Sequence, residues 1–135
     1  MSINRNNNNL SEQSPILLGS TFSMALIQRE VHIVPSDIAS LRSIIAQSGF
    51  ASFWGHTNTL AAANELLGTD INPATLRPAV SVSPEGYPML DDQVFTECWI
   101  LTPSYEPGFR PAIGQEVQPE QITGWNVLQM KWIDQ

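Results

Sequence analysis

Cysteine and histidine are scarce in this sequence of 135 residues, which leaves little from which to build a metal site. The one cysteine, Cys98, has no partner for an internal disulfide, and there is no thiol cluster for zinc. The two histidines lack the paired spacing of metal ligands. A Gly-rich phosphate loop, a nucleophile elbow and a hydrolase triad motif are also missing. We therefore expect no metal and no other cofactor.

Long apolar runs are missing as well. Every apolar run is interrupted by Ser, Pro, Gly or a charged residue before it reaches the roughly 20 residues of a membrane span. The first residues lack the basic flank, apolar stretch and small-residue cleavage site of a secretory signal. These absences predict an intracellular, cytoplasmic protein with no membrane partner.

Positive charge is the third shortage. Six Lys and Arg stand against 13 Asp and Glu, which gives a net charge of -7. A protein that binds duplex nucleic acid needs a basic face that displaces counterions from many phosphates, so duplex partners are excluded. Any phosphorylated ligand should be small, and it should be held by backbone amides, hydroxyls and one or two arginines.

What the sequence does contain indicates one globular domain. The hydrophobic share of 42% is ordinary, and the length is close to that of a typical domain. Residues 1–14 are polar and include four consecutive asparagines, so we expect a disordered N-terminal tail. Residues 15–135 are then expected to form a single domain.

Periodicity and turn residues predict a small α+β domain with two main helices on a mixed or antiparallel sheet of about five strands. Pro35 and Ser36 open the first helix, with Ser36 as its N-cap and Gly49 at its end. Gly68 closes the second helix. Asp91 and Asp92 are expected to form a solvated corner. Strands are expected at 16–18, 30–34, 50–54, 79–83, 93–102 (the longest) and 126–133, a loop at 103–118, and one helical turn at 119–123.

The most informative local stretch is FASFWGHTNT at 50–59, where an expected strand ends in glycine and His56 and Thr57 follow at the mouth of a helix. Free N–H groups and the helix dipole at such a point attract an anion such as a phosphate. A histidine there can donate to a phosphate oxygen or protonate a leaving alkoxide. The alternative is a helix start capped by Thr57, with His56 filling a groove. The other histidine, His32, alternates with core residues on a strand, which favours an outward polar role.

These segments, in this order, resemble the viral type III anti-CRISPR ring nuclease family, which also has bacterial and plasmid-borne members. The small polar turn of that family is similar to residues 20–23, STFS. Its Gly-Phe-x-Ser-x-Ile-Gly-His stretch with a Leu-Leu-Gly stop is similar to GFASFWGH at 49–56 and LLG at 66–68. The resemblance extends over about 120 residues, everything after the tail.

The resemblance implies a homodimer that binds cyclic tetra-adenylate, the second messenger of type III CRISPR defence, and cleaves it without metal. In that family a ribose 2′-hydroxyl attacks the adjacent phosphate. The resemblance assigns the general acid to His56 and a catalytic, ligand-holding role to Ser23. We expect the ligand-binding residues to be Ser20, Thr21, Thr57, Glu106 and Arg110.

The sequence departs from the family in the loop after the long strand. The family pattern there is Arg-Leu-Glu-Glu-Gly, and residues 104–108 read SYEPG, with Ser104 at the arginine position and Pro107 at the last acidic position. Glu106 is retained, and Arg110 lies just beyond and could supply the missing charge. Two alternatives therefore stay open: a non-catalytic sponge for a cyclic nucleotide on the same dimeric scaffold, and a protein-interaction domain for a basic partner.

Overall fold

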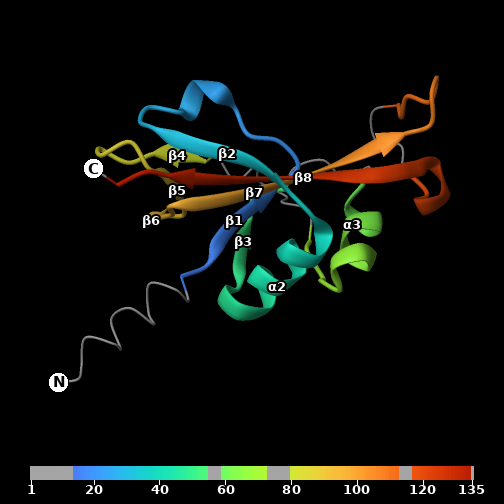
Figure 1. The fold of residues 1–135 in the computed structure, drawn as a ribbon, viewed down its shortest axis with the longest axis horizontal. Helices are drawn as coiled ribbons and strands as arrows, with labels where there is room; N and C mark the ends of the chain where they lie inside the picture. Colours follow the sequence, from blue (N-terminus) through green and yellow to red (C-terminus); the bar gives the residue numbers. More distant parts are fainter. Residues whose placement is uncertain (1–13, 55–58, 73–79, 113–116, 135) are drawn as a thin grey trace.

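The computed structural model describes residues 14–54, 59–72, 80–112 and 117–134. Within these ranges the chain has the predicted α+β fold, with a five-stranded mixed sheet, a small three-stranded sheet and two α-helices (Figure 1). No helix in these ranges is long and apolar enough to cross a membrane. Nearly all of 1–14 lies outside the described residues, so the disordered tail and the single domain from residue 15 stay predictions.

The main sheet has the strand order β2-β8-β7-β1-β3. β1 pairs in parallel with β3 and β7, whereas β8 pairs antiparallel with β7 and β2. These strands span β1 (Ile16–Gly19), β2 (Val31–Ser36), β3 (Phe50–Ser52), β7 (Glu97–Tyr105) and β8 (Ile122–Trp132). The strand in the middle of the parallel trio, β1, is buried along its whole length because the sheet is covered on both faces.

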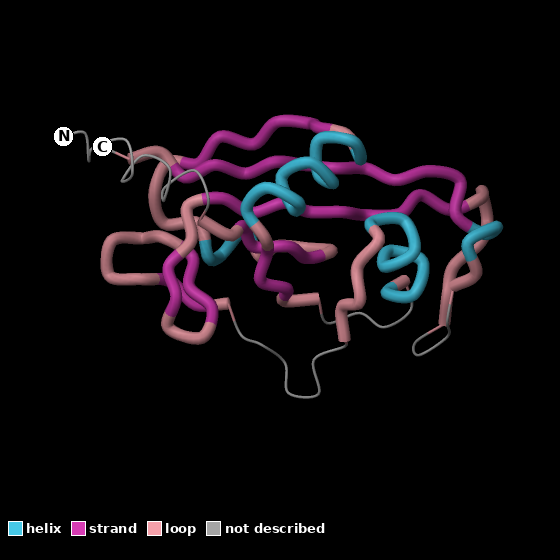
Figure 2. Tube along the Cα trace, turned by 90° about the horizontal axis from the view of Figure 1, so that it is seen from below, coloured by secondary structure: helices cyan, strands magenta, loops and turns pink. Residues whose placement is uncertain are grey.

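Both α-helices lie on one face of this sheet, as the sequence predicts (Figure 2). Leu41 of α2 (Ile38–Ser48) and Leu60 and Ala63 of α3 (Leu60–Leu67) join one core cluster with the sheet residues Leu18 and Leu101. Gly49 and Gly68 end the two helices with positive φ angles of 74° and 70°, a region that glycine enters without steric cost. Both predicted helix ends are confirmed.

The small sheet, β4 (Ser81–Val82), β5 (Pro88–Leu90) and β6 (Gln93–Val94), covers part of the other face. Asp91 and Asp92 join β5 to β6 in a two-residue turn, with φ angles of 51° and 64°. Positive φ at both central residues is the requirement of a type I′ hairpin, and aspartate tolerates it better than most residues. Both aspartates are exposed, which confirms the predicted solvated corner.

The prediction of a single long strand at 93–102 is wrong, because these residues are divided between the two sheets. Residues 93–94 belong to β6, and Phe95 then turns into the core, where its N–H donates to the carbonyl of Pro88 over 2.9 Å. β7 begins at Glu97 and continues through Pro103 and Ser104, which we expected in a loop. Beyond Ile100 the pairing with β1 has ended, so Pro103 has an open side on which its missing N–H costs nothing. The longest strand is β8, at 11 residues.

The expected helix start at Pro35 and Ser36 is also wrong. Both residues continue β2, and Ser36 pairs with Val127 of β8. The N-cap of α2 is Asp37, whose carboxylate accepts a hydrogen bond from the backbone N–H of Ser40 at 2.7 Å. This bond lowers the pKa of the Asp37 carboxyl below its usual value, since it favours the charged form.

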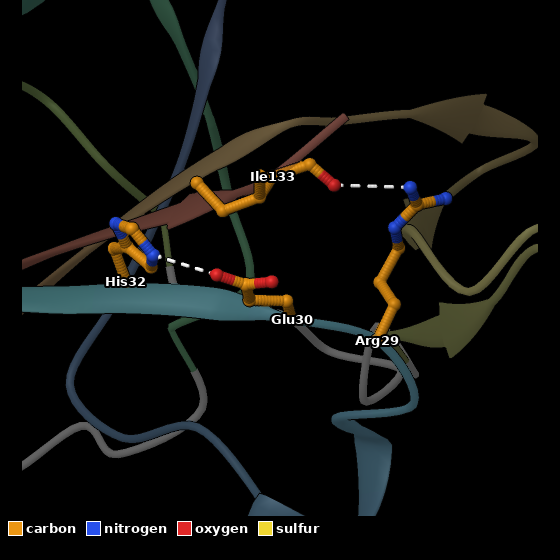
Figure 3. A network of polar contacts seen from close by, with 4 residues as sticks. All are labelled: Arg29, Glu30, His32 and Ile133. Carbon is orange, nitrogen blue, oxygen red and sulfur yellow. Dashed lines mark hydrogen bonds and ion pairs between the residues drawn. The ribbon is translucent and has the colours of Figure 1, made fainter. Parts of the chain in front are cut away.

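Arg29 fastens the small sheet to the end of β8. Its guanidinium donates to the carbonyls of Glu85 at 2.9 Å and Ile133 at 3.0 Å, and lies 4.2 Å from the centroid of the Tyr87 ring. Figure 3 shows Arg29 reaching Ile133, beside the exposed pair of His32 and Glu30. His32 is therefore an outward polar residue, as predicted.

Candidate functional site

The parallel strands β3, β1 and β7 end at the same edge of the main sheet. The seven predicted site residues all follow one of these strands in the sequence: Ser20, Thr21 and Ser23 follow β1, His56 and Thr57 follow β3, and Glu106 and Arg110 follow β7. Loops that follow parallel strands meet at one edge, which is where α/β sheets commonly bind ligands. The topology therefore brings together loops that lie far apart in the sequence.

A cavity of about 300 Å³ opens at this edge. It is lined by Ser20, Thr21, Thr59, Thr102, Pro103, Tyr105 and Pro111. We call it the hydroxyl cavity, because five of these seven side chains carry a hydroxyl. The lining residues that the structure describes include no charged side chain. Of the predicted residues, Ser20 and Thr21 line it.

Two contacts fix the turn that carries Ser20 and Thr21. The hydroxyl of Thr102 donates to the carbonyl of Ser20 over 3.1 Å, which ties the turn to β7. At Gly19 a Cβ atom would lie only 2.5 Å from the ring of Phe53, so the aromatic ring passes directly over the end of β1. A side chain at Gly19 would therefore displace either the ring or the turn.

His56 and Thr57 lie in the segment 55–58, outside the described residues, so the structure does not test the roles predicted for them. Thr59 is the first described residue after that segment. It is the N-cap position of α3, and it is 5% exposed and lines the hydroxyl cavity. The helix thus begins at Leu60, and the N-cap is two residues later than the Thr57 of our alternative interpretation.

Ser23, Glu106 and Arg110 are exposed and do not line the hydroxyl cavity. Ser23 precedes the short 3-10 helix η1 (Met24–Leu26), and its carbonyl accepts from Leu26. The Glu106 carbonyl accepts from the N–H of Phe109 in a turn after β7. Arg110 immediately precedes Pro111, which does line the cavity.

Sequence reasoning missed five of the seven lining residues of the hydroxyl cavity, including its three other hydroxyl-bearing residues: Thr59, Thr102 and Tyr105. Tyr105 follows a register shift between β7 and β8, and its ring contacts that of Phe109 at a centroid distance of 5.4 Å. Burial raises the pKa of the Tyr105 phenol above its usual value, which already keeps the hydroxyl neutral at pH 7. The sequence did not indicate that Tyr105 lies on a strand, because Pro103 was interpreted as the start of a loop.

A second cavity, of about 380 Å³, lies on the sheet face without α-helices. We call it the apolar groove, and it is lined by Ser20, Thr21, Phe22, Met24, Ile27, Ile33, Ile100, Thr102, Leu128 and Met130. It shares Ser20, Thr21 and Thr102 with the hydroxyl cavity. Three of its apolar side chains are unusually exposed: Met24 at 76%, Ile33 at 42% and Leu128 at 39%. Because they share three lining residues, the apolar groove and the hydroxyl cavity are neighbours.

No protein-family model and no curated protein matches this chain. Among solved structures the chain is similar to B116 of Sulfolobus turreted icosahedral virus, with a TM-score of 0.57 and 16% sequence identity. The similarity covers 89% of this chain and 100% of the viral one. At this identity the comparison shows a fold shared with a viral protein.

Proposed function

We propose that this protein is a metal-independent ring nuclease that binds and cleaves a cyclic oligoadenylate of the cyclic tetra-adenylate type, antagonising a host defence that this nucleotide signals. One observation carries the proposal. The seven predicted site residues follow, in the sequence, three parallel strands that end at one edge, where the described loops line the hydroxyl cavity. A chance resemblance gives no reason for such a distribution. The fold shared with a viral protein supports a viral, anti-CRISPR setting.

The reaction rearranges bonds within the ligand. A ribose 2′-oxygen bonds to the adjacent phosphorus and releases its proton to water, while the bond from phosphorus to the 5′-oxygen breaks. His56 gives the leaving 5′-oxygen its proton, so the linear product carries a cyclic phosphate and a 5′-hydroxyl. Ser20, Thr21, Ser23 and Thr57 hold the ligand through hydroxyl hydrogen bonds.

The described lining of the hydroxyl cavity carries no charge for the transition state, so we look for that charge in the neighbouring loop. At the position of the family arginine, the Ser104 hydroxyl accepts a hydrogen bond from the Asn126 amide over 2.9 Å. Arg110 precedes Pro111, which lines the cavity, and we assign to its exposed guanidinium the positive charge that the developing phosphorane needs. Glu106 completes the ligand-binding loop.

The ligand also suggests a dimer. A cyclic tetranucleotide has near two-fold symmetry, and a cavity of about 300 Å³ is at the small end of the ~300–1,000 Å³ range for drug-sized ligands. Two copies that meet over the apolar groove would place two hydroxyl cavities beside one interface. The exposure of Met24, Ile33 and Leu128 in that groove supports a covering partner.

Ile33→Glu tests the dimer, because it places a charge in the apolar groove. We expect light scattering at micromolar concentration to give a dimeric mass for the wild type and a monomeric mass for Ile33→Glu. Val34→Glu is the matched control. Val34 is also exposed, at 47%, and because it is adjacent to Ile33 on β2 its side chain points to the opposite face of the sheet. A monomeric wild type, with and without ligand, contradicts the dimer.

The second candidate is a sponge that binds a cyclic nucleotide without cutting it. The lack of charge among the described lining residues of the hydroxyl cavity and the replacement of the family arginine by Ser104 favour it, since both weaken transition-state stabilisation more than ground-state binding.

One experiment separates these functions. The purified protein is incubated with a panel of cyclic oligonucleotides in EDTA, and ligand and products are separated by chromatography. Linear products with a cyclic phosphate support the nuclease, and intact ligand retained by the protein supports the sponge. Protein that neither cleaves nor retains any member of the panel contradicts both.

A further inference from the structure

The lining of the hydroxyl cavity indicates which part of a nucleotide it can hold. Its described residues offer hydroxyls, two prolines and the ring of Tyr105, without a charged side chain. A phosphate is best held by cations or by several backbone N–H donors. A nucleobase instead needs an aromatic plane and neutral hydrogen-bonding groups. The cavity therefore suits an uncharged base and ribose better than a phosphate.

Tyr105 is the one aromatic residue among the described residues of this lining, and its position is fixed. Its backbone pairs with Ile122 of β8, and its half-buried ring makes a tilted contact of 64° with the ring of Phe109. A ring that is held before the ligand arrives loses little conformational entropy on binding. The family pattern has leucine at this position, which offers no π surface.

We propose that Tyr105 is the specificity-determining residue of this site, and that its ring stacks on one nucleobase of the cyclic ligand inside the hydroxyl cavity. The inference rests on the proposed function, since it assumes a cyclic nucleotide ligand. The hydroxyls of Ser20, Thr21 and Thr59 then meet the edge of the base and the ribose. The phosphates stay outside, toward Arg110. Stacking favours purines over pyrimidines, because a purine has the larger π surface.

The two tyrosines of the chain allow a direct test in the wild-type protein. Tyrosine is labelled in the ring with ¹³C, and the protein is titrated with cyclic tetra-adenylate that is methylated on its 2′-oxygens while the ring resonances are followed by NMR. This ligand cannot be cleaved, because its 2′-oxygens cannot attack the phosphates. We expect the Tyr105 signals to shift upfield through the ring current of adenine. Tyr87 is the internal control, because it lies under Arg29 and donates to Asp134 at the other end of the sheet. Tyr87→Phe assigns the two sets of signals.

Substitutions then measure the stacking contact. Tyr105→Leu should weaken the binding of cyclic tetra-adenylate by about 5- to 150-fold. It should also reduce the preference for cyclic tetra-adenylate over cyclic tetra-uridylate. Tyr105→Phe retains the ring and should weaken binding much less than Tyr105→Leu. Thermal unfolding of each variant shows whether it is folded, and if Tyr105→Leu is not, the NMR titration and Tyr105→Phe still decide.

The outcomes separate the two proposals. Ligand binding with an upfield shift at Tyr105 and a loss in Tyr105→Leu supports the inference. Ligand binding without the shift, or with equal affinity in Tyr105→Leu, overturns the stacking role and leaves the proposed function standing. A wild-type protein that binds neither cyclic ligand overturns both.

Discussion

The two ends of the main sheet differ in how they use their polar groups. At one end, with the small sheet and the C-terminus in Figure 1, Arg29 satisfies two backbone carbonyls and Phe95 and Trp132 are buried. At the other end, where β1 and β7 finish near α3, hydroxyl side chains line an open cavity. The closed end supplies packing, and the open end presents groups that a ligand can bind. The proposed binding site thus lies at the open end, while the closed end contributes mainly packing.

The largest expected effect concerns the proposed general acid, His56. His56→Ala should slow cleavage by roughly 10²–10⁴-fold with a much smaller change in affinity, since a general acid acts in the transition state. The wild-type rate should fall as pH rises through the pKa of this histidine, because the acid must be protonated. Rapid-quench kinetics measures the rate. His32→Ala is the control on an exposed histidine, and unchanged cleavage and binding in His56→Ala would contradict the functional role.

The largest expected effect at the closed end is on stability. Arg29→Leu removes two hydrogen bonds from a charged donor, so we expect the free energy of unfolding to fall by about 1.5–3 kcal/mol. Ligand affinity should remain as in the wild type while the protein is folded. Denaturant titration measures the loss. Arg42→Leu is the matched control, because Arg42 makes an exposed bond to the Leu66 carbonyl and should matter less. Equal losses of unfolding free energy in both variants would contradict the role of Arg29 in joining the small sheet to the end of β8.

A methyl group at Gly19 should affect both stability and binding. Gly19→Ala places a Cβ atom 2.5 Å from the Phe53 ring, and such overpacking costs about 1–3 kcal/mol. Because the turn with Ser20 and Thr21 follows directly, ligand affinity should fall as well. Calorimetry of unfolding and of binding tests both effects. Gly124→Ala is the control, since a Cβ there meets nothing within 4 Å; a wild-type affinity in Gly19→Ala would show that the turn is independent of β1.

The smallest expected effect is a gain at the closed end. Asp92 has a φ of 64°, which glycine adopts without the steric cost that an L-residue pays. Asp92→Gly should therefore raise the free energy of unfolding by about 0.5–1 kcal/mol, as measured by denaturant titration, with no change in ligand binding. A loss of stability would show that the aspartate side chain contributes more to the turn than its backbone strain costs.

The candidate site could be predicted in part. Ser20 and Thr21 line the hydroxyl cavity, and the loops after β1, β3 and β7 were identified from the sequence. Tyr105 and Thr102 were missed although the neighbouring Glu106 was assigned to the ligand, because Thr102 was expected inside a strand and Tyr105 in a loop. They line the cavity only because β7 extends beyond the end of β1. Whether His56 and Thr57 join them stays a prediction.

The sequence by itself determined the local elements: the apolar strand β1, the two helices, and their ends at Gly49 and Gly68. Side chains and glycines within a few residues encode these features, so no distant partner is needed. The tertiary structure alone decided that residues 93–102 divide between two sheets and that Ser36 and Pro103 belong to strands. A strand continues where a neighbouring strand offers hydrogen bonds, and that neighbour is usually far away in the sequence.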